Sequence, residues 1–152
     1  MYLMLKQRLW RLNDDYPTLV QWWTDWEFGI VPKECLPPDG IIVFKNDSPI
    51  CATGLYIGTG TKFGFMEWVV VNKKAPPKVC HKALTLCIDS VIDLAEQKGM
   101  TLLYTVTGAE ALHKRYTKYH GLRIMENNTK TFLKDIKNLY PNLDCFEEYE
   151  ES

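Results

Sequence analysis

Residues 79–99, with the sequence VCHKALTLCIDSVIDLAEQKG, form the most strongly helical pattern in the chain and constrain its fold more than any other segment. Apolar residues recur at positions 80, 84, 87, 91 and 94, the spacing of one helix face, and Lys98-Gly99 is a typical helix end. An apolar run of strand character stands on each side, FMEWVVV at 65–71 and MTLLYTVT at 100–107. This order predicts a strand–helix–strand crossover within one sheet.

Strands joined by short turns occupy much of the first half of the chain. Residues 2–12 have a strand pattern, and the apolar runs at 41–45, 50–58 and 65–71 are separated by the turn sequences NDSP and TGTKFG. Short turns of this kind join antiparallel neighbours. The sheet is therefore expected to be mixed, with most of its strand pairs antiparallel.

Two more helices are expected. The first begins near the N-cap candidates at 13–15, with Pro17 in its first turn, and places its leucine and tryptophan residues on one face. The adjacent tryptophans in QWWTDW are interpreted as core residues, and a ligand groove is the alternative. The second helix opens at a capping box, residues 107–110, and stops at Gly121.

These elements predict one domain of the α+β class, with a mixed, mostly antiparallel central sheet flanked by helices. The domain is expected to span residues 1–137, with closing strands at 122–126 and 130–136, the latter also compatible with a helix. After Lys137 the chain has five acidic and no basic side chains, so residues 138–152 are expected to form a solvated acidic tail. A regulatory or partner-binding arm is the alternative for that tail.

Charge and cysteine content argue against several classes of protein. Residues 1–137 hold 18 basic and 14 acidic side chains, a formal charge of +4, which is too little for a nucleic-acid footprint. No apolar run approaches the roughly 20 residues of a membrane span, and the first residues do not make a signal peptide. The five cysteines lack paired or metal-ligand spacing, so we expect reduced thiols, no metal site and a cytoplasmic location.

A cluster of basic residues surrounds the start of the long helix: Lys73, Lys74, Lys78, His81 and Lys82. A helix N-terminus carries partial positive charge, so each cation there costs roughly 0.3–1 kcal/mol at most. A phosphate-bearing ligand would reverse that cost, because the same N–H groups and helix dipole attract anions. Lysines that simply extend into water from an exposed turn are the alternative.

Two side chains could carry acid–base chemistry. Glu67 stands within FMEWVVV, an apolar setting that would raise the pKa of a carboxyl group and suit it to general-base work near neutral pH. A strand glutamate that faces solvent is the alternative. Tyr116 lies among basic residues on the last helix and could donate a proton to a leaving thiolate, and a packing role is its alternative.

The order of elements and three local patterns resemble the GNAT superfamily of acyl-CoA N-acyltransferases over about residues 2–136. FMEWVVV is similar to the family's fourth strand. PPKVCHKALTLCIDSVIDLAEQKG is similar to the helix that holds the pyrophosphate, and ALHKRYTKYHGL to the terminal motif with a catalytic tyrosine. The loop LPPDGIIV and the strand end EWVVVN most resemble short acetyltransferase-like proteins of tailed phages.

The resemblance implies an acetyl-CoA-dependent N-acetyltransferase that transfers an acetyl group directly to an amine. Glu67 takes the position of the catalytic base, and Tyr116 that of the residue that protonates the departing CoA sulfur. The implied contacts with acetyl-CoA are Val69, Val70 and Val71 on the strand and Lys78, Val79, Cys80, His81 and Lys82 at the helix start. The implied acceptor is a small amine or a protein lysine or N-terminus, and a second copy of the chain is a candidate partner.

The chain departs from the family pattern at the pyrophosphate helix. The family motif has a basic residue and two small residues where this sequence has Pro76, Val79 and His81. Side chains at a helix start need not block N–H donation, but they hold phosphates further out, where lysines can reach them. The departure supports a second hypothesis, a catalytically inactive module of the same fold that binds or inhibits a partner. The resemblance places acceptor choice in residues 16–40 without indicating the acceptor.

Overall fold

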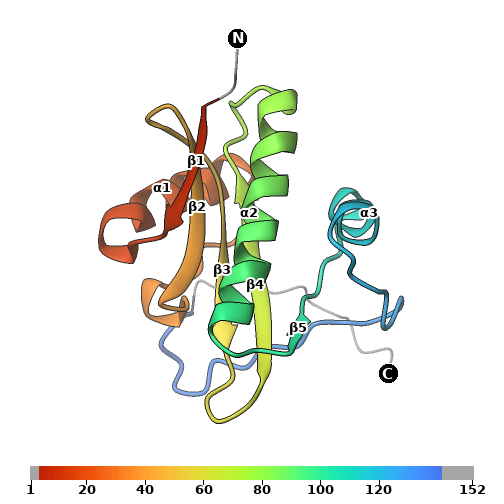
Figure 1. The fold of residues 1–152 in the computed structure, drawn as a ribbon. Coiled ribbons are helices and arrows are strands. Elements are labelled where there is room, and N and C mark those ends of the chain that lie inside the picture. The colour runs from red at the N-terminus through yellow and green to blue at the C-terminus, as the bar shows by residue number, and fades with distance from the viewer. Residues whose placement is uncertain (1–3, 142–152) are drawn as a thin grey trace.

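A computed structural model describes residues 4–141 of the 152-residue chain. The strands are β1 (Leu5–Leu9), β2 (Asp39–Lys45), β3 (Ser48–Ile57), β4 (Phe63–Val71) and β5 (Leu102–Tyr104), and the helices are α1 (Leu12–Asp25), the 3₁₀ turn η1 (Lys33–Cys35), α2 (Pro77–Gln97) and α3 (Glu110–Tyr119). The strands predicted in the first half of the chain, the long helix and both other helices are present (Figure 1).

The five strands form one sheet in the order of the sequence. β1, β2, β3 and β4 pair antiparallel, and β5 pairs parallel with β4. The parallel pair is joined by α2, as the strand–helix–strand pattern predicts. This arrangement confirms the predicted α+β class with a mixed, mostly antiparallel central sheet.

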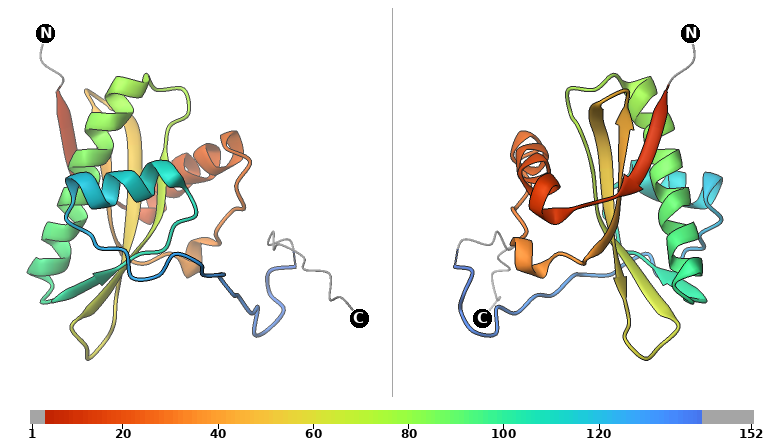
Figure 2. Two further views of the ribbon diagram at one scale, coloured as in Figure 1. Left: turned by 90° about the vertical axis from the view of Figure 1, so that its right-hand side faces the viewer. Right: turned by 60° about the vertical axis from the view of Figure 1, so that its left-hand side comes forward.

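Helices cover both faces of the sheet (Figure 2). α2 packs across one face with α3 beside it, and α1 covers the other face. The core under α2 contains residues of β2, β3, β4 and α2 together with Tyr116. The core under α1 contains Trp22 and Trp23, each only 3% exposed, so the interpretation of this pair as core residues is confirmed.

Trp10 fixes how the N-terminal segment approaches the sheet. Its ring lies over Gly40 of β2 and Gly54 of β3, where an added Cβ would come within 2.1 Å and 2.7 Å of the indole. Its Nε1 donates a hydrogen bond to the Pro37 carbonyl at 3.2 Å. Because no side chain fits under the ring, both strand positions require glycine.

The first turn of α1 is anchored by an ion pair, and the predicted N-cap at 13–15 is wrong. The N-cap residue is Arg11, which makes no side-chain cap, and Pro17 lies inside the helix. Asp15 instead accepts the Arg11 N–H at 2.7 Å and forms a bidentate pair with Arg8 of β1, with both N···O distances at 2.8 Å. Burial acts to raise the pKa of Asp15, but the bonds from Arg8 and Arg11 outweigh it and hold the pKa below its ordinary value.

The strands predicted for the last third of the chain are largely absent. β5 covers only Leu102–Tyr104 instead of 100–107, and the segments 122–126 and 130–136 contain no strand. Alternating apolar residues favour a strand, but a strand also needs a neighbouring backbone to satisfy its N–H and C=O groups. Neither segment has such a neighbour within the part of the chain that the structure describes, so the prediction of closing strands is wrong.

α3 begins without the predicted capping box. Thr107 Oγ1 accepts the N–H of Ala109 at 3.0 Å, one residue before the helix, and Ala109 is the N-cap residue without a side-chain bond. The helix therefore begins two residues later than a capping box with Thr107 as its N-cap would require. Gly121 follows the helix with a φ of 72°, a left-handed conformation that ends it as predicted.

The segment after α3 crosses the lower part of the sheet and reaches η1 on the side of α1 (Figures 1 and 2). There the Tyr140 hydroxyl donates a hydrogen bond to the Glu34 carboxylate and lies 3.6 Å from Cys35 Sγ. This contact joins the end of the described chain to the face covered by α1. Of the predicted acidic tail, 138–152, the residues from 142 onward lie outside the described part of the chain.

Replacing Asp15 with Asn is expected to lower the free energy of unfolding by about 2–3 kcal/mol at neutral pH, the range for hydrogen bonds to a charged group. Because the pKa of Asp15 is lowered in the folded state, its contribution is present above the ordinary carboxyl pKa and is lost as pH falls through the folded-state pKa. Urea unfolding at neutral and at acid pH measures both effects. The exposed Asp14→Asn is the matched control, and an equal loss in the two variants would contradict the anchoring role.

Candidate functional site

One extra residue in β4 interrupts the regular pairing with β3. Gly54 pairs with Glu67 and Ala52 pairs with Val70, so Thr53 alone faces two residues of β4. This arrangement is a β-bulge, which bends a strand and turns side chains and N–H groups out of the ladder. The bulge lies in the middle of the strand that the sequence singles out for chemistry.

Trp68, one of the two bulged residues, is in a strained backbone conformation. Its φ is 68°, a region that bulky residues rarely adopt and that costs about 1–3 kcal/mol. Its indole Nε1 donates to the Tyr56 hydroxyl at 2.8 Å, and its backbone N–H donates to Glu67 Oε1 at 3.1 Å. Strain that neighbouring contacts stabilise in this way is concentrated at functional sites, so the bulge is a candidate site on geometric grounds.

Glu67 is a partly buried carboxyl group on the face of the sheet that α1 covers. It lies opposite Gly54, whose added Cβ would contact Trp10, and directly opposed residues point to the same face. Burial raises the pKa of Glu67 above its ordinary value, and the hydrogen bond from the Trp68 N–H offsets part of that shift. The interpretation of Glu67 as a fully solvent-facing strand glutamate does not fit this environment. A carboxyl group with a raised pKa is suited to accept a proton near neutral pH.

β4 and β5 pair only at their first residues and then separate (Figures 1 and 2). The last paired residues are Phe65 and Tyr104, and one further bond runs from Thr105 Oγ1 to the Met66 carbonyl at 2.8 Å. Beyond that bond β4 continues to Val71, while the segment after β5 turns away from β4 toward α3. We call this opening the split. Within the described structure, the β5 side of residues 67–71 has no strand partner.

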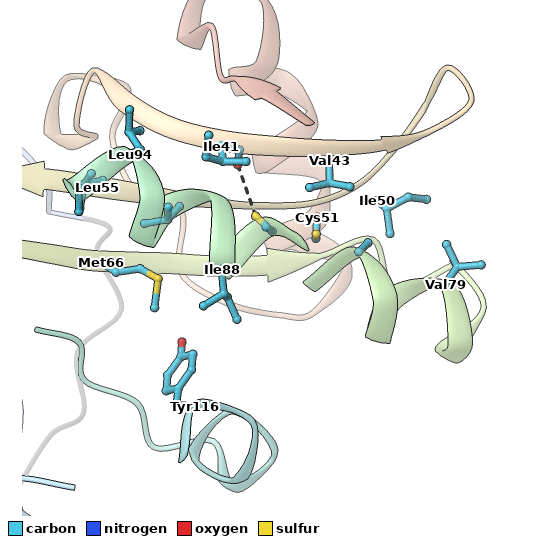
Figure 3. Close-up of a cluster of buried hydrophobic side chains, with 14 residues drawn as sticks. Ile41, Val43, Ile50, Cys51, Leu55, Met66, Val79, Ile88, Leu94 and Tyr116 are labelled. Atoms are coloured by element: carbon cyan, nitrogen blue, oxygen red, sulfur yellow. Dashed lines mark hydrogen bonds between the residues drawn. The ribbon is translucent and has the colours of Figure 1, made fainter. Parts of the chain in front are cut away.

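Tyr116 reaches from α3 to the closed end of the split. Its ring points between α2 and β4, toward Ile88 and Met66 (Figure 3), and it is only 5% exposed. The pKa of Tyr116 is raised to about 12: burial is the main cause, the Thr105 hydroxyl acts to lower it, and the charge of Glu67 adds to the increase. The packing role is therefore real. The Tyr116 hydroxyl nevertheless interacts with Thr105, the residue after which β4 and β5 separate.

The start of α2 forms a shallow depression of about 580 Å³. Its lining residues are Pro76, Pro77, Lys78, Val79, His81 and Lys82. Lys78, His81 and Lys82 are exposed there, whereas Val79 is 5% exposed and packs into the core under α2. Cys80 is turned inward, with its Sγ at 3.8 Å and 3.7 Å from the carbonyls of Asn72 and Ala75. The structure therefore gathers four of the five residues proposed at this helix start.

Two of the basic side chains near α2 have partners within the protein. Lys73 turns toward α1, where its Nζ lies 5.0 Å from the centre of the Trp26 ring and 3.3 Å from the Asp25 carbonyl. His81 Nδ1 accepts a hydrogen bond from Arg115 Nη2 at 2.7 Å. Arg115 also donates to Thr85 Oγ1 at 2.8 Å, which fixes α3 to the first turns of α2.

Sequence patterns singled out Glu67, Tyr116 and the helix start as candidates, but not the residues that contact them in the structure. Trp68 looked like another apolar strand residue, because a bulge depends on the register with β3. Thr105 lay inside a predicted strand that in fact ends before it. Arg115 was visible only as one basic residue among several, although it stands next to Tyr116 and adds positive charge beside the depression.

No group of three or more His, Cys, Asp or Glu side chains that could hold a metal ion is found in residues 4–141. Over the same residues, no helix is both long enough and apolar enough to cross a membrane. Neither a protein-family profile nor a curated protein matches the sequence.

The structure is similar to solved acetyltransferases. An aminoglycoside acetyltransferase from an uncultured soil metagenomic sample, in complex with sisomicin, matches with a TM-score of 0.64 and 13% identity over 86% of this chain and 97% of that one. A ribosomal-protein-alanine N-acetyltransferase from Brucella melitensis matches at 0.61 and 15% over 84% and 99%. The N-acetylglutamate synthase from Neisseria gonorrhoeae, complexed with coenzyme A and N-acetyl-glutamate, matches at 0.56 and 13% over 76% and 28%.

At these identities the similarity establishes a shared fold, and the predicted GNAT-like architecture is confirmed. The comparisons give no support to the resemblance to phage-encoded proteins.

Replacing Glu67 with Gln is expected to raise the free energy of unfolding at neutral pH. Because burial raises the pKa of Glu67, its stability contribution is full below the ordinary carboxyl pKa and is lost as pH rises through the folded-state pKa. Glutamine keeps the shape and can accept the Trp68 N–H without that loss. Thermal unfolding in acid and at about pH 8 measures the difference. The exposed Glu96→Gln is the control, and a Glu67→Gln variant less stable than the native chain at the higher pH would contradict this account.

Proposed function

We propose that the chain is an acetyl-CoA-dependent N-acetyltransferase that transfers the acetyl group directly to an amine. The observation that carries this proposal is the split between β4 and β5, with the Tyr116 hydroxyl at its closed end and the Glu67 carboxyl on the bulged strand beside it. The fold supports it, because the matched structures are acetyltransferases and one of them is complexed with coenzyme A.

In this proposal the pantetheine arm of acetyl-CoA lies along β4 in the split. The backbone groups of Val69, Val70 and Val71 that face away from β3 are the candidate hydrogen-bond partners of its amides. The Trp26 indole already donates to the Val71 carbonyl at 2.8 Å, which leaves the groups nearer the bulge for the ligand. The arm would then lead from the bulge toward the start of α2.

The diphosphate is assigned to the depression at the start of α2. The residues fit a phosphate in two respects: the Val79 side chain is directed into the core, and Lys78 and Lys82 are exposed at the rim. Unpaired N–H groups and the helix dipole attract anions at such a position. The free N–H groups are those of Lys78 and Val79, because the Cys80 N–H donates to the Pro76 carbonyl at 3.0 Å. In this assignment Cys80 and His81 lie beside the diphosphate without donating a backbone N–H to it.

The transfer itself requires one base and one polarising group. The acceptor ammonium loses a proton to the Glu67 carboxylate, directly or through water, and the neutral amine nitrogen forms a bond to the thioester carbonyl carbon. A backbone N–H near Val69 polarises the carbonyl oxygen. The C–S bond then breaks, its electron pair leaves on the CoA sulfur, and the amide nitrogen releases its second proton to water. No covalent enzyme intermediate is needed.

Tyr116 is assigned to the departing sulfur as a hydrogen-bond donor. With a pKa of about 12 it stays protonated at neutral pH. Complete proton transfer to a thiolate with a pKa near 8.5 would be uphill by about 5 kcal/mol. A hydrogen bond from the phenol stabilises the thiolate without that cost, and the thiolate takes its proton from water after it leaves. This role is narrower than the full protonation that the sequence resemblance implies.

A non-catalytic binding module is the second candidate function. The observation that favours it is the contact between His81 and Arg115, which ties up one of the two positions where the family motif has small residues. In such a module the depression would bind no acetyl donor, and the fold would present its surface to a partner. The two functions differ in whether coenzyme A is released in the presence of an amine.

Turnover is expected to depend on both proposed catalytic residues. Glu67→Gln should slow acetyl transfer by about 100-fold or more, the usual contribution of a general base. Tyr116→Phe should slow it by roughly 10- to 100-fold, the value of one hydrogen bond to a charged atom. Release of the CoA thiol in the presence of a panel of amines measures the rate, with Glu96→Gln as the control. Equal rates in Glu67→Gln and the control would refute the assigned role, and no release from the native chain with any amine would favour the binding module.

The lysines at the depression are expected to act in opposite directions on stability and on affinity. Lys78→Ala should raise the stability of the free protein by up to about 1 kcal/mol, because it removes a cation from the first turn of a helix, and Lys82→Ala should raise it less, because Lys82 lies in the second turn. Each should also weaken acetyl-CoA binding by roughly 3- to 10-fold at low salt, and the difference should shrink at about 1 M salt. Lys62→Ala, at the other end of β4, is the control. Unchanged affinity in both variants would contradict the phosphate assignment.

A further inference from the structure

Four aromatic rings form a continuous row across β3, β4 and β5. Phe65 lies between Tyr56 and Tyr104, with ring centroids 6.1 Å and 5.7 Å away, and Phe63 lies 5.9 Å from Tyr104. Tyr56 and Tyr104 are the strand residues directly opposite Phe65. We call these four residues the aromatic row.

The aromatic row lies on the same face of the sheet as Glu67. Residues two apart on a strand point to the same face, so Phe63, Phe65 and Glu67 share one. This is the face covered by α1, but the helix does not cover the row. Phe63 is 44% exposed and Tyr104 is 37% exposed, even with the segment after α3 in place.

Cross-strand aromatic pairs stabilise sheets in many proteins, and the contacts within the row need no further explanation. The exposure of these rings beside a partly buried carboxyl group does need one. Ring faces left open to water, next to a group suited to accept a proton, have the composition of a ligand site: apolar area for the body of a ligand and one polar group that fixes its orientation.

The strand residues on this face carry a single negative charge. On β3, β4 and β5, the face with the row also carries Ala52, Gly54, Trp68, Val70 and Leu102, and Glu67 is the only charged side chain among these strand residues. An ammonium group at this place is attracted by the charge of the carboxylate and also by the faces of the aromatic rings. These strand residues include no cation that could bind a phosphate or carboxylate on the acceptor.

We infer that the acceptor is a primary amine attached to a flat, apolar or aromatic body. Its amino group lies at Glu67 and its body lies along Phe65, Tyr104 and Phe63. This inference rests on the proposed function, because only a transferase has an acceptor. It adds a separate claim about which amines bind. Tyr56 also joins the row to the bulge, because its hydroxyl accepts the Trp68 indole N–H at 2.8 Å and donates to the Cys35 carbonyl at 2.6 Å.

Binding of amines can be measured without turnover, in the presence of coenzyme A, which carries no acetyl group to transfer. The probes are 2-phenylethylamine, ethylamine and glucosamine, titrated into the full chain by calorimetry. 2-Phenylethylamine is expected to bind at least about tenfold more tightly than ethylamine, because its ring is buried against the row. Glucosamine, which is polyhydroxylated, is expected to bind no better than ethylamine.

Variants of the row should remove this preference. Phe63→Ala and Tyr104→Ala should reduce the ratio of the two affinities toward one, and Tyr104→Phe should keep it. Phe132→Ala, which removes a ring that is 88% exposed and outside the row, is the matched control and should keep the ratio. Both changed positions are partly exposed, so the fold is expected to survive either truncation.

The outcomes separate this inference from the proposed function. Acetyl transfer that is equally efficient with phenylethylamine and ethylamine, or equal affinities for the two, would overturn the role of the row and leave the transferase standing. Tight binding of phenylethylamine with no acetyl transfer to it would contradict the transferase and leave the row as a binding site for flat amines. Loss of the preference in Phe63→Ala with retention in Phe132→Ala would support the inference.

Discussion

The bulge in β4 is the constraint on which the rest of the candidate site depends. Because Thr53 faces two residues, the strand after the bulge is turned relative to the strand before it. Glu67 stays on the face of α1, and Trp68 adopts a φ of 68° that is stabilised by bonds to Tyr56 and to Glu67 itself. The strand then continues without β5. A regular strand at this place would pair along its whole length and leave no split for a ligand.

The basic residues at the start of α2 have more than one role. Lys73 packs on Trp26 of α1, and His81 accepts a bond from Arg115 of α3, so these two help to join helices. Lys78 and Lys82 remain exposed at the rim of the depression. A helix start that keeps two free cations beside its own positive dipole is less stable than it could be, and such a cost is common where a site is shaped for an anion.

The sequence predicts the elements better than it predicts the site. Period and punctuation located the long helix and the first four strands, and the apolar setting of Glu67 correctly indicated a raised carboxyl pKa. The bulge could not be read, because it is a property of two paired strands and not of FMEWVVV alone. The bond between Arg115 and His81 is equally invisible, since it depends on how α3 packs on α2. The prediction of closing strands at 122–126 and 130–136 was wrong, because an alternating apolar pattern does not supply the neighbouring strand that a sheet requires.

If the proposed function is right, the split between β4 and β5 binds the thioester end of acetyl-CoA. A crystal structure of the full chain grown with acetyl-CoA would show this. The expected structure has the pantetheine arm along Val69–Val71, the sulfur within hydrogen-bonding distance of the Tyr116 hydroxyl, and the diphosphate beside Lys78 and Lys82. A nucleotide bound elsewhere on the chain, with the split filled by the protein's own side chains, would contradict it.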